Sequence, residues 1–325
     1  MKLLIAGAGF IVQDWLTITQ HLKDVDLVAS AGVEADKENM GKLQSKYGIK
    51  EVYTDYDQAL REANVNTVYV GVPNSLHYSF VKKALNAGKN VVCEKLFIVK
   101  YDEFKELKEL ALSKYLVLVE AITNQYLTNY RELKDKVKTL GPVRIVSMNY
   151  SQYSHRYDAF KKGKILPVFD PKKGGGALMD LNIYNIHFLV GLFGMPKSVK
   201  YVANIQRGID TSGMLILDYG DFKAVLIAAK DCAAPVTSLI EGEDGTIVVN
   251  GPANVMDSFD IYQGQKETAH VDDKVYPHRM YEEFNELNRM IKDHDMDKTK
   301  KMLQHSDEVM QIVQEAVNDA GLKLE

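Results

Sequence analysis

A carboxylate and an amine stand side by side at the end of a predicted strand in this 325-residue chain. Residues 67–95 read TVYVGVPNSLHYSFVKKALNAGKNVVCEK, which predicts a strand, a turn, an amphipathic helix and a second buried strand. Glu94 and Lys95 close that second strand. Because ligands of open α/β sheets bind beyond the carboxyl ends of the strands, we expect Lys95 to take part in chemistry rather than packing.

A second pair of reactive side chains follows three glycines, in GGGALMDLNIY at residues 174–184. The glycines allow the backbone to fold closely against a ligand, and a helix is expected after them. Asp180 and Tyr184 are four residues apart and therefore share one helix face. Tyrosine has a pKa near 10, so Tyr184 needs a nearby cation to act as a base at neutral pH, and Lys95 would supply it. The alternative is a plain loop followed by a half-buried helix tyrosine.

The amino terminus predicts a dinucleotide site. A short apolar strand, residues 2–6, runs into Gly7-Ala8-Gly9 and then into an amphipathic helix. Two glycines at such a turn let the backbone approach a pyrophosphate, which the helix N-terminus favours. Val12 stands where the fingerprint has its third glycine. An ordinary glycine-rich turn between strand and helix remains the alternative.

The end of the second strand bears on the choice between NAD and NADP. Dinucleotide folds place an acid there to accept the ribose hydroxyls. Glu34 is the first candidate and Asp36 the second, while a solvated acidic helix start would explain either residue. No arginine follows that could hold a 2′-phosphate, although Lys37 is close. We therefore expect NAD or NADP, with NAD preferred.

Two domains are expected from the order of the elements. Strands near residues 3, 27, 52, 68, 91 and 116 alternate with helices, which predicts a doubly wound parallel sheet in a dinucleotide-binding Rossmann domain, residues 1–122. Residues 123–325 are strand-rich, with a hairpin turn at Gly220-Asp221. They predict an α+β domain with an open, mainly antiparallel sheet for substrate binding and oligomerisation. Such a sheet often leaves one face uncovered, so we expect a homodimer or homotetramer.

Composition narrows the class of protein. A net charge of −4 gives no general attraction to nucleic acid or anionic membranes. The two cysteines lie far apart, and no Cys/His cluster has metal-ligand spacing, so no metal is expected. The chain starts directly with a strand and lacks an apolar stretch of the ~20 residues that span a bilayer. A cytoplasmic protein is expected.

Four motifs occur in order: GAGFI at residues 7–11, VPNSLH at 72–77, AGKNVVCEK at 87–95 and GGGALMDLNIY at 174–184. In this order and spacing, the whole chain resembles the Gfo/Idh/MocA oxidoreductases. The resemblance implies a Rossmann domain, a carboxyl-terminal domain whose open sheet is used in oligomerisation, and NAD(P)-linked hydride transfer with sugars, polyols or related diols. The partners expected are thus a small-molecule substrate and further copies of the chain.

The resemblance also assigns roles. Lys95 matches the lysine of the family's Glu-Lys-Pro motif, and Asp180 matches the aspartate of its glycine-rich motif. Tyr184 falls where many members carry a catalytic histidine; tyrosine there resembles the branch with glucose–fructose oxidoreductase, dimeric dihydrodiol dehydrogenase and xylose dehydrogenase. The expected cofactor-binding residues are Gly7, Gly9, Phe10, Ile11, Glu34, Pro73, Asn74, His77, Glu94 and Lys95. The expected substrate-binding residues are Asp180 and Tyr184 from the resemblance and, from the residues themselves, Asn124 after the sixth strand and Tyr153 and Arg156 in SQYSHRY at residues 151–157. An exposed loop is the alternative for residues 151–157.

The expected mechanism uses three catalytic residues. Tyr184 removes the proton of a secondary alcohol as hydride leaves, Lys95 stabilises the alkoxide and lowers the tyrosine pKa, and Asp180 orients substrate or lysine. Three positions depart from the family pattern: Leu96 replaces the proline after Glu-Lys, Asn182 replaces a glycine, and Val12 replaces the third glycine of the fingerprint.

Other functions fit parts of the sequence. The Tyr-x-x-x-Lys pattern of short-chain dehydrogenases occurs twice, at Tyr130/Lys134 and Tyr157/Lys161, but neither accompanies that family's longer glycine fingerprint. A reductase for dihydrodiols or carbonyl compounds would need a more apolar pocket. A cofactor-binding regulatory or scaffold protein without turnover is the alternative from another class, and Leu96 is its support.

Overall fold

The computed structural model describes residues 1–323. The chain divides into two compact units. Unit 1 comprises residues 1–121 and 280–306, and unit 2 comprises residues 122–279 with the carboxyl-terminal segment from Asp307. The sequence assigned residues 280–306 to the second domain, whereas in the structure this segment clusters with unit 1.

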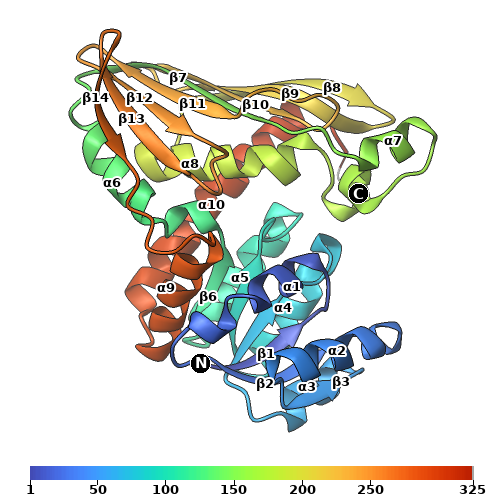
Figure 1. Ribbon diagram of the computed structural model, residues 1–325. Coiled ribbons are helices and arrows are strands. Elements are labelled where there is room, and N and C mark those ends of the chain that lie inside the picture. The colour runs from blue at the N-terminus through green and yellow to red at the C-terminus, as the bar shows by residue number, and fades with distance from the viewer. Residues whose placement is uncertain (324–325) are drawn as a thin grey trace. The chain divides into compact units, whose positions relative to one another are not determined.

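Unit 1 is built on a six-stranded, all-parallel sheet with the strand order β3-β2-β1-β4-β5-β6 (Figure 1). This order is that of a doubly wound dinucleotide-binding fold, so the predicted fold of the first half is confirmed. The strands are β1 (Lys2–Ala6), β2 (Asp26–Ala31), β3 (Glu51–Tyr53), β4 (Thr67–Val70), β5 (Asn90–Glu94) and β6 (Leu118–Ala121). The intervening helices are α1 (Phe10–Leu16), α2 (Lys37–Tyr47), α3 (Tyr56–Glu62), α4 (His77–Asn86) and α5 (Tyr101–Ser113).

An aromatic cluster joins the late helix α9 (Met280–Lys292) to the sheet of unit 1. The Trp15 ring lies 4.9 Å from the Tyr69 ring and 5.0 Å from the Phe284 ring, measured between centroids. All three side chains are fully buried. Burial of large aromatic rings supplies much of a core's stability, which explains why residues so late in the sequence belong to unit 1.

Unit 2 contains an eight-stranded sheet in the order β14-β13-β12-β11-β7-β10-β9-β8 (Figure 1). Only β7 and β10 run parallel to each other, so the predicted mainly antiparallel sheet is confirmed. The strands are β7 (Val143–Ser151), β8 (Ser198–Gln206), β9 (Ile209–Asp218), β10 (Lys223–Ala229), β11 (Thr237–Gly242), β12 (Thr246–Asn250), β13 (Ser258–Gln263) and β14 (Lys266–Val271). The helices of this unit are α6 (Thr128–Val137), α7 (Arg156–Lys161), α8 (Ile183–Phe193) and the end of α10 (Met296–Asp319).

The sequence did not predict β11, β13 or β14. Strand β14, KETAHV, forms an edge of the sheet and is almost entirely exposed. A two-sided solvated strand shows no alternation of apolar and polar residues, so the usual signal is absent. The single helix predicted from about residue 176 instead begins with a π-helical turn, Leu178–Asn182, and continues as α8.

No stretch of membrane-spanning length was expected from the sequence, yet one helical segment, Pro171–Phe193, is long and apolar enough to cross a membrane, with a mean hydropathy of 1.2. It is 78% buried inside the protein. The core helix of a folded domain has the same length and composition, and the burial identifies this segment as such a helix.

Candidate functional site

The turn between β1 and α1 is shaped by contacts that only glycines permit. Gly7 has φ +105°, and a Cβ atom there would lie 2.6 Å from the Gly71 carbonyl oxygen at the end of β4. A Cβ on Gly71 would in turn lie 2.7 Å from Cγ2 of the buried Val12. The absence of a Cβ at Gly71 therefore makes room for Val12, which replaces the third glycine of the fingerprint.

The same turn is open on its outer side. A Cβ at Gly9 would meet no atom within 4 Å, and the side chain of Phe10 is 80% exposed. Ile11 is half-buried at the start of α1. A backbone that is open beside a helix start is the cradle that a pyrophosphate requires.

Glu34 presents its carboxylate to solvent in the turn that follows β2. Its side chain is 72% exposed and lies 3.1 Å from the Lys37 ammonium. The hydrogen bond from Lys37, together with one from Thr54, lowers the pKa of Glu34. Asp36 instead accepts a hydrogen bond from the Val33 amide at 3.4 Å, so Glu34 is the carboxylate better placed for a ribose.

His77 links two loops at the carboxyl ends of β4 and β5. Its ring is completely buried; Nδ1 lies 2.9 Å from the Leu96 carbonyl oxygen and 3.1 Å from that of Phe97. Nε2 lies 2.9 Å from the Val72 carbonyl oxygen. Burial lowers the pKa of His77. This histidine thus positions the backbone beside Pro73 and Lys95, and its predicted contact with the cofactor stays a prediction.

The segment after Lys95 is anchored although it lacks the family's proline. The Lys95–Leu96 peptide bond is cis, and Leu96 and Phe97 are buried. The Phe97 amide donates to Glu120 Oε1 at 3.2 Å, and Ser306 Oγ donates to Glu120 Oε2 at 2.7 Å. The sequence analysis missed Glu120; its signal is a single charge in an otherwise apolar strand.

Glu94, the partner of Lys95 in the motif, lies inside unit 1. Its carboxylate is buried and accepts a hydrogen bond from the Tyr69 hydroxyl at 2.7 Å. A carboxylate held by a buried phenol has a fixed orientation. Glu94 therefore helps to hold the end of β5 from which Lys95 extends.

In unit 2, two residues after β6 hold the helix that carries Tyr184. Asn124 is buried, and its side-chain amide donates to the Tyr184 carbonyl oxygen at 2.9 Å. Gln125 donates to the His187 carbonyl oxygen at 2.8 Å. The Tyr184 ring is buried, with its centroid 6.1 Å from that of Tyr150. Asn124 thus positions the backbone of Tyr184, and its contact with substrate stays a prediction.

Asp180 forms an ion pair with Lys230, a residue that the sequence analysis missed. The Lys230 side chain is only 3% exposed, whereas that of Asp180 is 33% exposed. Lys230 also donates to the Val168 carbonyl oxygen at 3.2 Å, and its ammonium lies 5.1 Å from the centre of the Phe169 ring. No sequence motif includes both residues of the pair, because motifs are short and Lys230 follows Asp180 by fifty residues.

A hollow of about 370 Å³ in unit 2 opens beside this ion pair. We call it the Asp180 hollow. Its lining includes polar side chains from the segment after β7, the start of α7, the π-helical turn and the position after β10: Gln152, Tyr153, Ser154, Arg156, Asp180 and Lys230. The structure therefore brings together three of the predicted substrate-binding residues, Tyr153, Arg156 and Asp180. The Tyr153 hydroxyl donates to Asp158 at 2.7 Å, which fixes its ring on α7.

Two of the three glycines before Asp180 pack against the protein itself. A Cβ on Gly175 would lie 2.7 Å from the Asp170 amide nitrogen, and one on Gly176 would overlap the Asp210 carboxylate. Asp210 is buried and accepts hydrogen bonds from the Leu178 amide at 2.6 Å and the Tyr201 hydroxyl at 2.7 Å. Burial raises the pKa of Asp210 to about 6. Asp210 thus anchors the start of the π-helical turn.

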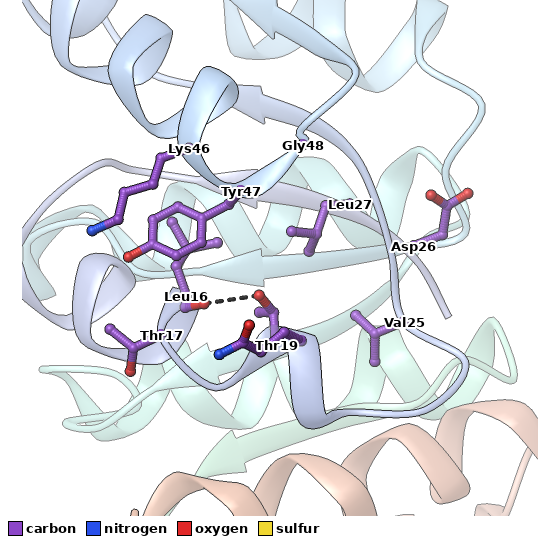
Figure 2. Close-up of a pocket in the computed structure, with 10 residues that line it drawn as sticks. Leu16, Thr17, Thr19, Val25, Asp26, Leu27, Lys46, Tyr47 and Gly48 are labelled. Carbon is purple, nitrogen blue, oxygen red and sulfur yellow. Dashed lines mark hydrogen bonds between the residues drawn. The ribbon is translucent and has the colours of Figure 1, made fainter.

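A larger hollow, of about 690 Å³, lies in unit 1. Figure 2 shows its lining, which includes Asp26 and Leu27 at the amino end of β2 together with Tyr47 and Gly48. Ligands of doubly wound sheets bind at the opposite, carboxyl ends of the strands. This hollow is therefore not the candidate site.

Two family models match the chain. One, "Oxidoreductase family, NAD-binding Rossmann fold", covers residues 1–122, and the other, "GFO/IDH/MocA C-terminal domain", covers residues 130–248. The scyllo-inositol 2-dehydrogenase (NADP(+)) IolU of Bacillus subtilis is 32% identical over 99% of this chain and 98% of its own length. The chain belongs to the Gfo/Idh/MocA oxidoreductase family.

Further relatives of this Gfo/Idh/MocA protein are more distant. The trans-1,2-dihydrobenzene-1,2-diol dehydrogenase of Xenopus tropicalis is 26% identical over 81% of this chain and 78% of its own length. A 3-ketoreductase from Actinomadura kijaniata, solved in complex with NADP and TDP-benzene, has a TM-score of 0.81 at 18% identity. It covers 97% of this chain and 98% of its own, and the likeness confirms the fold.

Membership of the Gfo/Idh/MocA family makes this chain an NAD(P)-dependent oxidoreductase with its Rossmann domain in unit 1. The predicted family, fold class and enzyme class are confirmed. Unit 1 fits a dinucleotide, because the backbone at Gly9 is open and the Glu34 carboxylate is exposed. Among residues 1–323, no cluster of three or more His, Cys, Asp or Glu side chains is placed to hold a metal ion.

Proposed function

We propose that this protein transfers hydride between NAD(P) and a secondary alcohol or carbonyl of a sugar, polyol or related diol. The observation that carries the proposal is the Asp180 hollow, whose lining of hydroxyl, amide and charged groups suits a ligand with several hydroxyls. The names of the inositol and dihydrodiol dehydrogenases among the relatives support the same substrate class.

In this proposal, each polar side chain has one role in the reaction. The bound nicotinamide supplies the hydride acceptor or donor. Tyr184 takes the proton of the substrate hydroxyl, and Lys95 stabilises the alkoxide and lowers the pKa of the phenol. Asp180 accepts a hydrogen bond from a second substrate hydroxyl, with its carboxylate oriented by Lys230. Arg156 and Tyr153 contact the remainder of the substrate.

NAD is the proposed preferred cofactor, because the exposed Glu34 carboxylate would repel a 2′-phosphate and accept ribose hydroxyls. Lys37 provides the counter-argument: it lies beside Glu34 and could turn toward a phosphate. The relative from Bacillus subtilis is named as NADP-linked. Replacing Glu34 with Gln should therefore bring the affinities for NADH and NADPH closer together.

The first experiment is to titrate the purified protein with NADH and then with NADPH, following nicotinamide fluorescence. Micromolar binding of either cofactor, followed by turnover in a panel of sugars and polyols, would support the proposal. Cofactor binding with no hydride transfer to any panel member would favour the regulatory or scaffold alternative. Binding of neither cofactor would refute the proposed dinucleotide site.

Self-association is proposed through the open face of the sheet in unit 2. Figure 1 shows α6 and α8 on one side of that sheet, and no helix of the described residues lies on the other. Val202 pairs with Met214, and Met214 pairs with Ile227, so these side chains form a row across β8, β9 and β10. Val202, Met214 and Ile216 are at least 39% exposed.

Exposed apolar rows of this kind mark interfaces, and a homodimer or homotetramer is the proposed assembly. Replacing Met214 with Lys should yield monomers, as measured by light scattering during size-exclusion chromatography. Replacing exposed Lys266 on β14 with Met is the matched control and should leave the assembly unchanged. A wild-type monomer at micromolar concentration would refute this part of the proposal. A cytoplasmic location also stays a prediction, to be tested by cell fractionation.

A further inference from the structure

The charge balance of the Asp180 hollow bears on the substrate's own charge. Asp180 is the acidic residue in the lining, and Arg156 and Lys230 are the permanent cations. A charge that is already neutralised within the protein adds little to the attraction of a ligand. Only a side-chain charge without such compensation attracts a ligand of opposite charge.

Lys230 and Asp180 neutralise each other. With its side chain 3% exposed, the Lys230 ammonium has lost most of its contact with water. A buried ammonium is retained only with a counter-charge and hydrogen-bond acceptors, and Asp180 and the Val168 carbonyl supply them. The pair therefore contributes no net charge to the hollow.

Arg156 is not neutralised in the same way. Its side chain is exposed at the start of α7, and no acidic group of residues 1–323 lies within ion-pair distance of it. The nearest acid in sequence, Asp158, is already engaged by the Tyr153 hydroxyl at 2.7 Å and the Lys161 ammonium at 2.8 Å. A net positive charge thus remains at the hollow.

The surrounding segment has the same sign. Residues 152–173 contain six basic and two acidic side chains, although the whole chain has a net charge of −4. A local concentration of cations in an acidic protein attracts anionic ligands and raises their association rates.

We propose that the substrate carries a carboxylate and that Arg156 binds it, so that the substrate class is sugar acids or polyol acids rather than neutral polyols. The inference rests on the proposed function and narrows it. The planar guanidinium presents two parallel N–H groups to the two oxygens of a carboxylate. Asp180 remains for a hydroxyl of the same ligand, since its partner Lys230 prevents repulsion of the incoming anion.

The test compares gluconate with its neutral counterpart glucitol, and glucuronate with glucose, in wild type and in the Arg156→Gln variant. We expect kcat/KM at least ~10-fold higher for an acid than for its neutral partner. Arg156→Gln should reduce kcat/KM for the acid by about 10–100-fold, mainly through KM, as expected for a hydrogen bond to a charged group. The neutral substrates should change little.

Lys162→Gln is the matched control, because Lys162 is an exposed cation next to α7 that does not line the hollow. It should leave the discrimination between acid and neutral substrates unchanged. Equal kcat/KM for both members of each pair, in wild type and Arg156→Gln alike, would overturn the inference while leaving the proposed function intact. A preference for glucose 6-phosphate over both carboxylates would overturn the assignment of a carboxylate.

A binding measurement separates this inference from the proposed catalytic function. Gluconate at millimolar concentration should raise the Tm of the cofactor-loaded wild type more than glucitol does, and this difference should disappear in Arg156→Gln. This readout does not require turnover. If gluconate and glucitol shift the Tm equally, the carboxylate subsite is refuted even in an active enzyme.

Discussion

The turn around Gly7 and the Asp180 hollow are built in opposite ways. The turn is defined by backbone: Gly7 approaches the Gly71 carbonyl because it has no Cβ, and Gly71 leaves room for Val12 for the same reason. The hollow is defined by side chains from three segments, residues 152–156, Asp180 and Lys230. A site made of backbone leaves glycines at fixed spacing in the sequence. A site made of side chains leaves no such trace, because its members are joined only by the fold.

The largest expected effect is at Lys95, which lies in neither region and is the proposed cationic partner of Tyr184. Replacing Lys95 with Ala should reduce kcat by about 10²–10⁴-fold, the range for a positioned acid–base group, and change NADH affinity by only a few-fold. Steady-state kinetics and fluorescence titration measure the two quantities. Lys114→Ala removes an exposed lysine of the same unit and should affect neither. Near-normal turnover of Lys95→Ala would refute the catalytic role.

The second prediction tests whether side-chain charge holds the hollow together. Lys230→Met removes the ion pair with Asp180 and should lower the free energy of unfolding by about 3 kcal/mol. Breaking a buried pair costs about 3–5 kcal/mol, and the partial exposure of Asp180 reduces that figure. Denaturant melts measure it. The double variant Lys230→Met/Asp180→Asn should recover part of the lost free energy of unfolding. If its loss equals the sum of the losses of the two single variants, the ion pair contributes nothing to stability.

The third prediction tests the backbone-defined turn. Gly7→Ala places a Cβ at 2.6 Å from the Gly71 oxygen and forces alanine to φ +105°. We expect about 100-fold weaker NADH binding, since strained backbone of this kind costs about 1–3 kcal/mol and the overlap adds to it. Gly41→Ala, on α2 with open space around its Cβ, is the control and should bind NADH normally. Unchanged binding by Gly7→Ala would show that the turn does not hold the cofactor.

The last prediction concerns Asp210 and depends on pH. Its pKa is raised from 3.8 to about 6 by burial, so between these values the folded protein binds a proton that the unfolded chain has lost. Stability therefore falls as pH rises from about 4 to 6, by no more than about 3 kcal/mol.

Asp210→Asn should remove this dependence. The Tm of the variant should exceed that of wild type increasingly from about pH 4 to pH 6 and by a constant amount above that, while the two converge below pH 4. Thermal melts at fixed ionic strength measure the difference. The exposed Asp293→Asn is a suitable control, with no such trend expected. A constant offset between Asp210→Asn and wild type across this range would contradict the raised pKa.

Most of unit 1 could be predicted, because each strand and helix has a local signal. Buried parallel strands are continuous apolar runs, and β5 ends at Glu94 as the motif indicated. The packing of α9 on unit 1 could not be predicted. Its apolar face is visible in the sequence, but an apolar face does not specify which sheet it covers.

The site was predicted in part. Tyr153, Arg156 and Asp180 were named from the sequence and line one hollow. Glu120 and Lys230 were not predicted as site residues. A single charged residue within a strand, or directly after one, is not a signal of a functional site. The glycines at 175 and 176 were expected to approach a ligand, whereas they approach Asp170 and Asp210. Glycines in a sequence indicate that there is no room for a Cβ atom, but they do not identify the neighbouring group.

The sequence by itself determined the fold class and the family, since these depend on short-range patterns and on the order of four motifs. Only the tertiary structure decided which charges are neutralised. Lys230 follows Asp180 by fifty residues, and their pairing depends on how β10 lies beside the π-helical turn. Coulombic attraction acts through space and is strengthened by burial, so the charge that the Asp180 hollow offers to a substrate is a property of the folded protein.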